Sequence, residues 1–287
     1  MKSFKVNADQ VGQRLDEFLA DKIALLSRSS IAKLIKNTKV QVNNSPEKPS
    51  YKLKLNDRVT LDYDLQPSIP KINLPIIYED DACIVINKPV GVLSHSKGAF
   101  NPEATVASFI QDRLHGLSGE RAGIVHRLDR PTSGVIIAAK TSTALSWLQK
   151  QFAQRKVKKT YIAVISGHIE PKQAIIDMPI ERHPKTPKLF RVGVGGKPAN
   201  TEYKVLKSSK NYDLVELKPQ TGRTHQLRVH LKQQGHPIVG DLLYGGPDAD
   251  RLYLHAQSLE LTLPNRQRQT FVIKPPKEFA SIIKNDG

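Results

Sequence analysis

The stretch from Gly123 to Lys140, GIVHRLDRPTSGVIIAAK, places one carboxylate between two guanidinium groups. Asp129 lies two positions after Arg127 and directly before Arg130, where an apolar run gives way to a turn sequence with proline and glycine. A nearby cation favours the ionised form of a carboxylate. Asp129 is therefore either one partner of a structural salt bridge or a reactive carboxylate, because both kinds of site bring charged groups together.

The sequence after Asp129 indicates how this carboxylate would be positioned. Residues 135–139, VIIAA, form a continuous apolar run, which predicts a buried strand. Pro131 fixes its own φ and disfavours the helical region for Arg130, whereas Gly134 can adopt φ values that other residues resist. We therefore expect Asp129 to lie at a tight turn immediately before a buried strand.

The letters of this motif resemble those of the RluA-type pseudouridine synthases, in which HRLDRPTSG is the catalytic motif and its aspartate the catalytic residue. Three further segments resemble motifs of the same family in the same order. They are KKTYIAVISGHI around Tyr161, QTGRTHQLRVH from Gln220 to His230, and GDLLYG at 240–245. The resemblance covers essentially the whole chain and is nearest to the RluD-type enzymes, which act on large-subunit ribosomal RNA.

The resemblance implies that Asp129, Tyr161 and Arg228 are the catalytic residues. Pseudouridine formation breaks the bond between uracil N1 and ribose C1′ and rejoins the same base through C5. Arg228 is expected to pair with Asp129 and keep it ionised, and Tyr161 to stack on the base and help to move the C5 proton. The reaction needs no redox change, group donor or metal, so no cofactor is expected, and no His, Cys or Asp spacing indicates a metal site.

Other side chains in these motifs are candidate RNA contacts. The target uridine must leave its stack, and Arg127 is expected either to fill the vacated space or to bind a phosphate. Arg223 is a second candidate contact and the alternative cation for Asp129. His126 is a third candidate, although a histidine at a strand end is more often a hydrogen-bonded core residue. The same structural interpretation applies to His225, His230 and His255. The charge run RKVKK at 155–159 is interpreted as a solvated helix end.

Residues 1–62 are predicted to form a small N-terminal α/β domain. Two amphipathic helices followed by short strands are expected within residues 14–61. Their order and spacing resemble the S4-like RNA-binding domain, in which the second helix carries a basic RNA-contacting face. By that resemblance Arg28, Lys33 and Lys36 bind RNA, and the alternative is a charged face that only contacts solvent.

A segment with three prolines, residues 63–75, is predicted to link this domain to a catalytic domain at 76–287. In the catalytic domain, the predicted strands outnumber the helices and are mostly joined by turns. The expected fold class is therefore α+β, with a mixed, largely antiparallel sheet and flanking helices around a cleft. Helices are expected at 103–114 and 141–155, and another after the turn at 220.

The chain has 287 residues, with 44 lysines and arginines against 27 aspartates and glutamates, a formal net charge of +17. Such an excess favours a polyanionic partner, and we expect RNA. The resemblance narrows this partner to large-subunit rRNA or its assembly precursor. No apolar run approaches the roughly 18 residues of a membrane span, and the N-terminus lacks the apolar core of a signal peptide. We expect a monomeric, cytoplasmic protein that does not bind membranes.

Two other functions are open alternatives. A catalytically silent RNA-binding or ribosome-assembly factor would use the same basic surface, but the presence of Asp129, Tyr161 and Arg228 argues against it. A glycosidase would need a second acidic residue in the same cleft. Asp241 is the nearby candidate for that residue, and its glycine neighbours predict a turn role instead.

Overall fold

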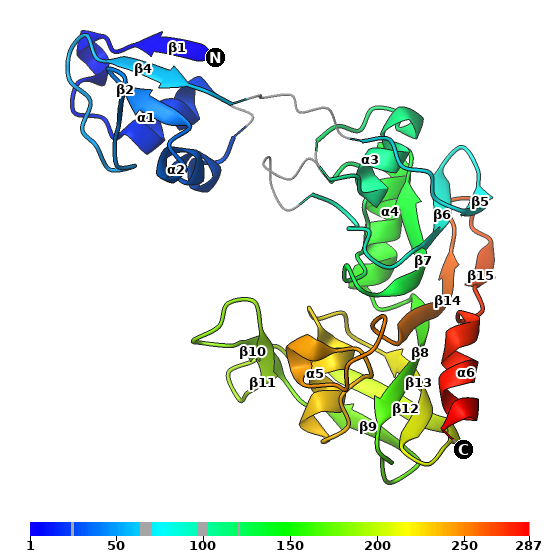
Figure 1. The fold of residues 1–287 in the computed structure, drawn as a ribbon. Coiled ribbons are helices and arrows are strands. Elements are labelled where there is room, and N and C mark those ends of the chain that lie inside the picture. Colours follow the sequence, from blue (N-terminus) through cyan, green and yellow to red (C-terminus); the bar gives the residue numbers. More distant parts are fainter. Residues whose placement is uncertain (24–25, 64–69, 97–102, 120, 287) are drawn as a thin grey trace. The chain divides into compact units, whose positions relative to one another are not determined.

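The computed structural model describes residues 1–23, 26–63, 70–96, 103–119 and 121–286 (Figure 1). The chain divides into two compact units. The smaller unit spans Met1–Pro70 with Ser96–Glu103, and the larger spans Lys71–His95 with Ala104–Gly287. Of the linker predicted at 63–75, residues 64–69 lie outside the described part of the chain.

The smaller unit is a four-stranded antiparallel sheet packed against two helices. Its elements are β1 (Lys2–Lys5), the 3-10 turn η1 (Ala8–Gln10), α1 (Leu15–Lys22), α2 (Arg28–Lys36), β2 (Val40–Val42), β3 (Ser45–Pro46) and β4 (Arg58–Leu61). Helix α2 begins where the Ser27 hydroxyl accepts a hydrogen bond from the Ser30 N–H at 3.2 Å. Its apolar face, Ile31, Leu34 and Ile35, is buried. The predicted pair of helices followed by short strands is confirmed.

The larger unit is built on a nine-stranded sheet in the order β5-β6-β7-β14-β8-β13-β12-β9, with β15 also paired to β14. The strands are β5 (Ile76–Glu79), β6 (Cys83–Lys88), β7 (Ser133–Ala139), β8 (Lys158–Ser166), β9 (Gln173–Asp177), β12 (Asn200–Ser208), β13 (Tyr212–Pro219), β14 (Leu254–Thr262) and β15 (Arg268–Val272). The described ladders are antiparallel except that between β7 and β14. The predicted α+β class with a mixed, largely antiparallel sheet is confirmed.

Strand β14 comes late in the chain and yet lies between β7 and β8, near the middle of the sheet (Figure 1). It pairs with β7 at His255 with Ser133 and at Ala256 with Gly134. A Cβ on Gly134 would lie 2.2 Å from the Ala256 carbonyl oxygen, so only glycine permits this close approach. Gly134, which ends the HRLDRPTSG motif, therefore permits β7 and β14 to pair, and this pairing connects the two halves of the sheet.

Helices pack against both halves of this sheet. They are α3 (Val106–Ile110), α4 (Ser142–Ala153), α5 (Gln226–Gln233) and α6 (Lys277–Asn285), with 3-10 turns η2 (Gln111–Arg113) and η3 (Leu242–Tyr244) and a separate hairpin of β10 (Ile180–Arg182) and β11 (Phe190–Val192). One core lies among β6, β7 and α4, and another among β8, β13, α5 and α6.

The helices predicted at 141–155 and after the turn at 220 are confirmed as α4 and α5. The helix predicted at 103–114 is shorter, because Thr105 accepts a hydrogen bond from the Ser108 N–H and so starts α3 at Val106. After Ile110 the chain continues only as a 3-10 turn. Within the described residues, no helix is long and apolar enough to cross a membrane.

Candidate active site

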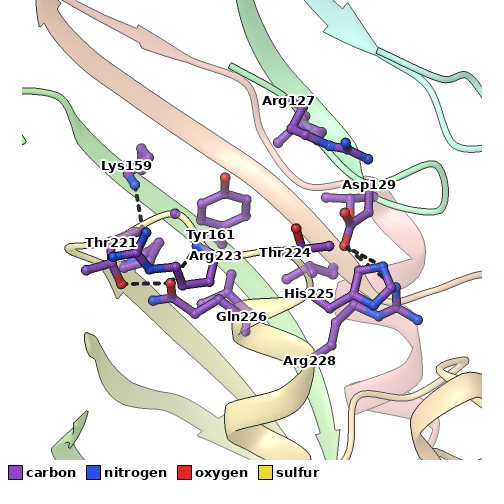
Figure 2. Close-up of a pocket in the computed structure, with 16 residues that line it drawn as sticks. Arg127, Asp129, Lys159, Tyr161, Thr221, Arg223, Thr224, His225, Gln226 and Arg228 are labelled. Atoms are coloured by element: carbon purple, nitrogen blue, oxygen red, sulfur yellow. Dashed lines mark hydrogen bonds and ion pairs between the residues drawn. The ribbon is translucent and has the colours of Figure 1, made fainter. Parts of the chain in front are cut away.

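A pocket of about 110 Å³ lies where the HRLD segment, strand β8 and the start of helix α5 meet. The three predicted catalytic residues, Asp129, Tyr161 and Arg228, all line it, and so do the predicted substrate contacts Arg127 and Arg223. Figure 2 shows the Asp129 side chain facing His225 and Arg228, with Tyr161 on the same pocket wall as Lys159. Residues separated by as many as 127 positions in the sequence, from 127 to 254, thus meet in one cavity.

The backbone on both sides of Asp129 is fixed by buried polar groups. The Leu128 N–H donates to the Ser94 hydroxyl at 3.0 Å, and this hydroxyl donates to the Leu128 carbonyl at 2.9 Å. On the other side, the fully buried Lys88 ammonium donates to the Arg130 carbonyl at 3.3 Å. Burial lowers the pKa of Lys88 to about 7 although the charge of Asp129 acts in the opposite direction. The Asp129 side chain therefore extends from a clamped backbone.

Arg228 binds two carboxylates, and its stronger contacts are with Asp241. Its Nε and Nη2 donate to the two Asp241 carboxylate oxygens at 2.7 Å each, whereas its Nη1 lies 3.6 Å from Asp129 Oδ2. Burial lowers the pKa of Arg228, but the hydrogen bonds and charge of Asp241, and then the charge of Asp129, outweigh this and raise it. The predicted pairing of Arg228 with Asp129 is thus present as the longer of two ion pairs.

The prediction for Asp241 was incomplete. Its carbonyl does accept turn hydrogen bonds, from the N–H groups of Tyr244 and Gly246. Its carboxylate, however, is fully buried against Arg228 in a bidentate pair, a geometry that fixes the guanidinium plane. Sequence reasoning missed this partner because 13 residues separate the two side chains and no local pattern relates them.

His225 lies in the pocket, contrary to its interpretation as a core histidine. Its Nε2 is 3.8 Å from Asp129 Oδ2, and its Nδ1 is 2.8 Å from the Tyr244 hydroxyl. Burial lowers the pKa of His225, and among the nearby charges Asp129 opposes this shift while Arg228 reinforces it. The Tyr244 hydroxyl already accepts from the Phe190 N–H at 3.1 Å, which leaves its proton for Nδ1. This arrangement suits a neutral imidazole whose hydrogen is on Nε2, facing Asp129.

The other two histidines in question, His230 and His255, are fully buried and hydrogen-bonded through both ring nitrogens, as the structural interpretation predicts. His126 also bonds to the backbone, because its Nε2 accepts from the Ile137 N–H at 3.1 Å. Its ring stacks on Phe152 at 4.6 Å, and burial, followed by the charge of Lys159, lowers its pKa to about 3. These contacts favour the structural alternative for His126.

Strand β8 contributes Tyr161 and Lys159, which are two positions apart and so lie on one face of the strand. Burial, and after it the charge of Asp129, raises the pKa of Tyr161, so its hydroxyl is protonated at neutral pH. Lys159 donates from Nζ to the Thr221 carbonyl at 3.0 Å, and burial lowers its pKa to about 8. The interpretation of 155–159 as a solvated helix end was therefore wrong for Lys159, because the strand already begins at Lys158.

The two candidate arginines differ in their contacts. Arg127 is exposed and lines the mouth of the pocket. Arg223 donates from Nε to the Pro198 carbonyl at 3.0 Å and forms no ion pair with Asp129 among the described contacts. Arg228 rather than Arg223 is therefore the arginine beside Asp129. Within the described residues, no group of His, Cys, Asp and Glu side chains is arranged to hold a metal ion.

The candidate RNA contacts on α2 differ in the same way. Lys33 and Lys36 are exposed. Arg28 instead donates from Nε to Asp16 at 3.1 Å and from Nη1 to Glu17 at 2.8 Å, which ties α2 to α1. Its guanidinium is thus partly engaged within the small unit.

Comparison with known proteins identifies two families in the chain. Residues 82–233 match the model of the RNA pseudouridylate synthase family, and residues 13–59 match that of the S4 domain. The first match covers more than half of the chain and contains Asp129, Tyr161 and Arg228. The second lies within the smaller unit.

Individual relatives agree with these matches. An uncharacterised RNA pseudouridine synthase of Aquifex aeolicus is 42% identical over 84% of this chain and 79% of its own length. A protein named ribosomal large subunit pseudouridine synthase D, from Salmonella typhimurium, is 39% identical over 84% of this chain and 75% of its own. Among solved structures, human RNA pseudouridylate synthase domain containing 1 aligns with a TM-score of 0.60, 30% identity, and coverage of 71% and 84%.

These findings decide between the alternatives. None of the relatives supports a catalytically silent RNA-binding factor. The glycosidase alternative fails because Asp241, the candidate second carboxylate, is bound on both oxygens by Arg228. The family models, the relatives and the fold of the catalytic part therefore lead to one conclusion: the chain belongs to the RNA pseudouridylate synthase family, carries an S4 domain, and isomerises uridine in RNA.

Proposed function

We propose that this chain converts specific uridines of large-subunit ribosomal RNA into pseudouridine, with Asp129 as the catalytic carboxylate. The single observation that carries the assignment to Asp129 is its position: it lines the pocket on a clamped backbone, 17% exposed, with Arg228 Nη1 3.6 Å away. The choice of rRNA rests on relatives named for that activity, including one from Vibrio parahaemolyticus that is 34% identical over 91% of this chain. We place the enzyme in the cytoplasm as a monomer.

In the proposed reaction, the bond from N1 to C1′ breaks, C5 bonds to C1′, the C5 proton leaves and N1 gains a proton. Asp129 supplies the ionised carboxylate next to the sugar and base. Arg228 would place a positive charge beside this carboxylate, since its Nη1, the nitrogen that Asp241 does not use, lies 3.6 Å from Asp129 Oδ2. Asp241 acts through Arg228 and is thus a positioning residue.

Tyr161 and His225 would surround the base with groups that carry no charge at neutral pH. The raised pKa of Tyr161 keeps its hydroxyl protonated, which suits stacking against uracil and relaying a proton from C5. The lowered pKa of His225 keeps its imidazole neutral beside Asp129. Arg127, exposed at the mouth, would occupy the space of the flipped uridine or hold a phosphate.

The N-terminal region would contribute affinity and choice of site. We propose a domain at residues 1–62, a linker at 63–75 and a catalytic domain at 76–287. Lys33 and Lys36 are the principal RNA contacts of the N-terminal domain, because both are exposed on α2. Arg28 contributes less, since Asp16 and Glu17 already bind it.

The test is to map pseudouridines in large-subunit rRNA of cells with and without this gene. We expect one or more positions to revert to uridine when the gene is deleted. Expression of the intact chain should restore them, and expression of Asp129→Asn should not. An unchanged pseudouridine map in rRNA, with losses in another RNA class, would refute the proposed substrate; restoration by Asp129→Asn would refute the catalytic assignment.

A further inference from the structure

A second pocket, of about 440 Å³, adjoins the catalytic pocket. The two share six lining residues, which are Arg127, Lys159, Tyr161, Thr221, Gly222 and Arg223. Beyond these, the second pocket extends to the C-terminal end of α4 and is lined there by His126, Phe152, Ala153, Arg155 and Val157. We call this second cavity the flanking pocket. An RNA strand whose uridine occupies the catalytic pocket would therefore place its neighbouring nucleotide in the flanking pocket.

The charge of the flanking pocket is of one sign. Four cationic side chains line it, Arg127, Arg155, Lys159 and Arg223, and none of its lining residues is acidic. Two of these cations are held in place by carbonyl groups rather than by carboxylates, Lys159 by Thr221 and Arg223 by Pro198. None of the four forms an ion pair with a described carboxylate. Their charge is therefore uncompensated, which favours an anionic ligand such as a phosphate.

One wall of the flanking pocket is apolar and fixed. Phe152 and Val157 line it, and the Phe152 ring is backed by a stack with His126 at an interplanar angle of 20°. His126 is in turn bound to the backbone of β7 at Ile137. An aromatic surface beside a row of cations is the combination that proteins use to bind single-stranded nucleotides, in which the base stacks and the phosphate is neutralised.

Arg155 occupies a backbone position that favours glycine over residues with a side chain. Its φ is 56°, in the left-handed region. Its N–H donates to the Phe152 carbonyl at 3.1 Å, and the next N–H, of Lys156, donates to the Gln151 carbonyl at 3.0 Å. This pair of hydrogen bonds ends α4 as a Schellman motif, whose left-handed position is most often glycine. An arginine at this position is disfavoured by its backbone, so its presence calls for a role of the side chain.

We propose that the flanking pocket binds the RNA nucleotide next to the flipped uridine, with Arg155 contacting its phosphate and the apolar wall receiving its base. The proposal rests on the function proposed above and adds a subsite to it. Arg155 contributes to RNA binding and not to the reaction, because it lines only the flanking pocket. The subsite would make recognition depend on single-stranded RNA on one side of the target.

The test compares Arg155→Gly with the unaltered chain in RNA binding and thermal unfolding. Binding is measured in the Asp129→Asn background, so that the RNA is not converted. Because glycine is preferred at this φ, we expect the unfolding midpoint to stay the same or rise. RNA affinity should fall by roughly ten-fold, as for loss of a charged hydrogen bond. The slope of log affinity against log salt should become shallower by about 0.7, the value of one single-strand phosphate contact.

Arg266→Gly is the matched control. Arg266 is also an exposed arginine with positive φ, 71°, but it lies in the turn between β14 and β15, over the Trp147 ring and outside both pockets. The Arg266→Gly substitution removes the same charge at the same kind of backbone position, but outside both pockets. We therefore expect RNA affinity and salt slope to stay close to those of the unaltered chain. Arg155→Lys should restore most of the slope. If Arg155→Gly and Arg266→Gly lost RNA affinity equally, the loss would be due to the change in net charge, and the proposed subsite would be wrong.

A second arm identifies the phosphate. Synthetic RNAs carry an uncharged methylphosphonate at one position at a time beside the mapped uridine. One flanking position should weaken binding to the unaltered chain and have little further effect on Arg155→Gly, because both changes remove one contact. If every position adds fully to Arg155→Gly, the inference is wrong. Failure of the proposed function is separate: if the mapped uridine lies in another RNA class and this coupling is found around it, the proposed rRNA substrate fails and the subsite stands.

Discussion

Arg228 presents three nitrogens to two carboxylates, and Asp241 binds two of them. The contacts to Asp241 are 2.7 Å long, whereas Nη1 lies 3.6 Å from Asp129. Asp241 is completely buried and Asp129 is 17% exposed. The guanidinium is therefore held by Asp241, which solvent does not reach, and its positive charge lies beside Asp129 without a hydrogen bond that would fix the Asp129 side chain.

Replacing Asp129 should separate chemistry from binding. We expect Asp129→Asn to abolish pseudouridine formation, because the amide cannot supply the charge that the reaction requires. RNA affinity should remain within a few-fold, since neither the arginines at the pocket mouth nor the S4 domain is changed. Release of tritium from uracil C5 in labelled RNA measures the reaction, and filter binding measures the affinity. Normal turnover by the purified variant would contradict the catalytic role of Asp129.

Arg228→Met should destabilise the protein chiefly through Asp241. The substitution leaves a fully buried carboxylate without its bidentate partner, which costs about 3–5 kcal/mol of unfolding free energy. The double variant Arg228→Met with Asp241→Leu should recover most of this loss, because the buried charge is also removed. It should still lack activity, because Asp129 has lost its cation. Urea unfolding and single-turnover assays test both claims, and a double variant with normal activity would contradict the role of Arg228.

Histidine burial should make stability depend on pH in mildly acidic solution. His255 is 1% exposed, and burial lowers its pKa to about 4 from an ordinary value of about 6.5. As the pH falls, His255 is therefore protonated in the unfolded chain before it is protonated in the folded one. The stability that the neutral buried imidazole contributes is fully present above about pH 6.5 and is lost as the pH falls toward 4. The slope approaches 1.4 kcal/mol per pH unit for one group.

His255→Gln provides the comparison for this slope. The glutamine does not titrate, so the fall in unfolding free energy between pH 6.5 and 4.5 should be less steep in the variant, whatever its stability at pH 7.5. Urea unfolding at four pH values in that range measures both slopes. Parallel curves for the two proteins would show that His255 is not held neutral.

The basic face of α2, formed by Lys33 and Lys36, should contribute to RNA affinity and not to the rate of the reaction. Lys33→Ala with Lys36→Ala removes two exposed cations, and each lost phosphate contact should make the salt slope shallower by about 0.7 on single-stranded or 0.9 on duplex RNA. The rate at saturating RNA should be unchanged, because the catalytic motifs lie in the other unit. Lys48→Ala with Lys52→Ala is the control, since both lysines are exposed in the same unit but lie off this helix. Equal slopes for both pairs would identify the α2 charges as a solvated face.

The sequence was sufficient to predict that Asp129, Tyr161 and Arg228 belong to one site, because each lies in a short local motif, and all three line the same pocket. The apolar run after the HRLD letters predicts a buried strand, and β7 confirms it. The apolar residues before these letters predict a second strand, and this prediction was wrong, because Ile124 forms only an isolated bridge to Ala138. Apolar residues at helical spacing likewise predict the helix at 141–155, which α4 confirms. Both kinds of prediction depend only on neighbours in the chain.

The partners of these residues could not be predicted in the same way. Whether Asp241 binds Arg228, or whether the His225 imidazole reaches Asp129, depends on how distant elements pack. His225 has a φ of 56°, which turns its side chain toward the pocket at the start of α5, and histidine is not a residue that signals this conformation. Lys159 was misassigned because a run of positive charge does not show where the preceding helix ends.

The insertion of β14 between β7 and β8 has a consequence for the synthesis of this enzyme. Until residues 254–262 have emerged from the ribosome, β7 and β8 each have an unpaired edge, and the two parts of the sheet are not joined. Asp129 immediately precedes the first of these strands and Tyr161 lies on the second. The nascent chain therefore contains all three proposed catalytic residues before the sheet that positions them is complete, and we expect the pocket to form only when β14 is added at the centre of the sheet.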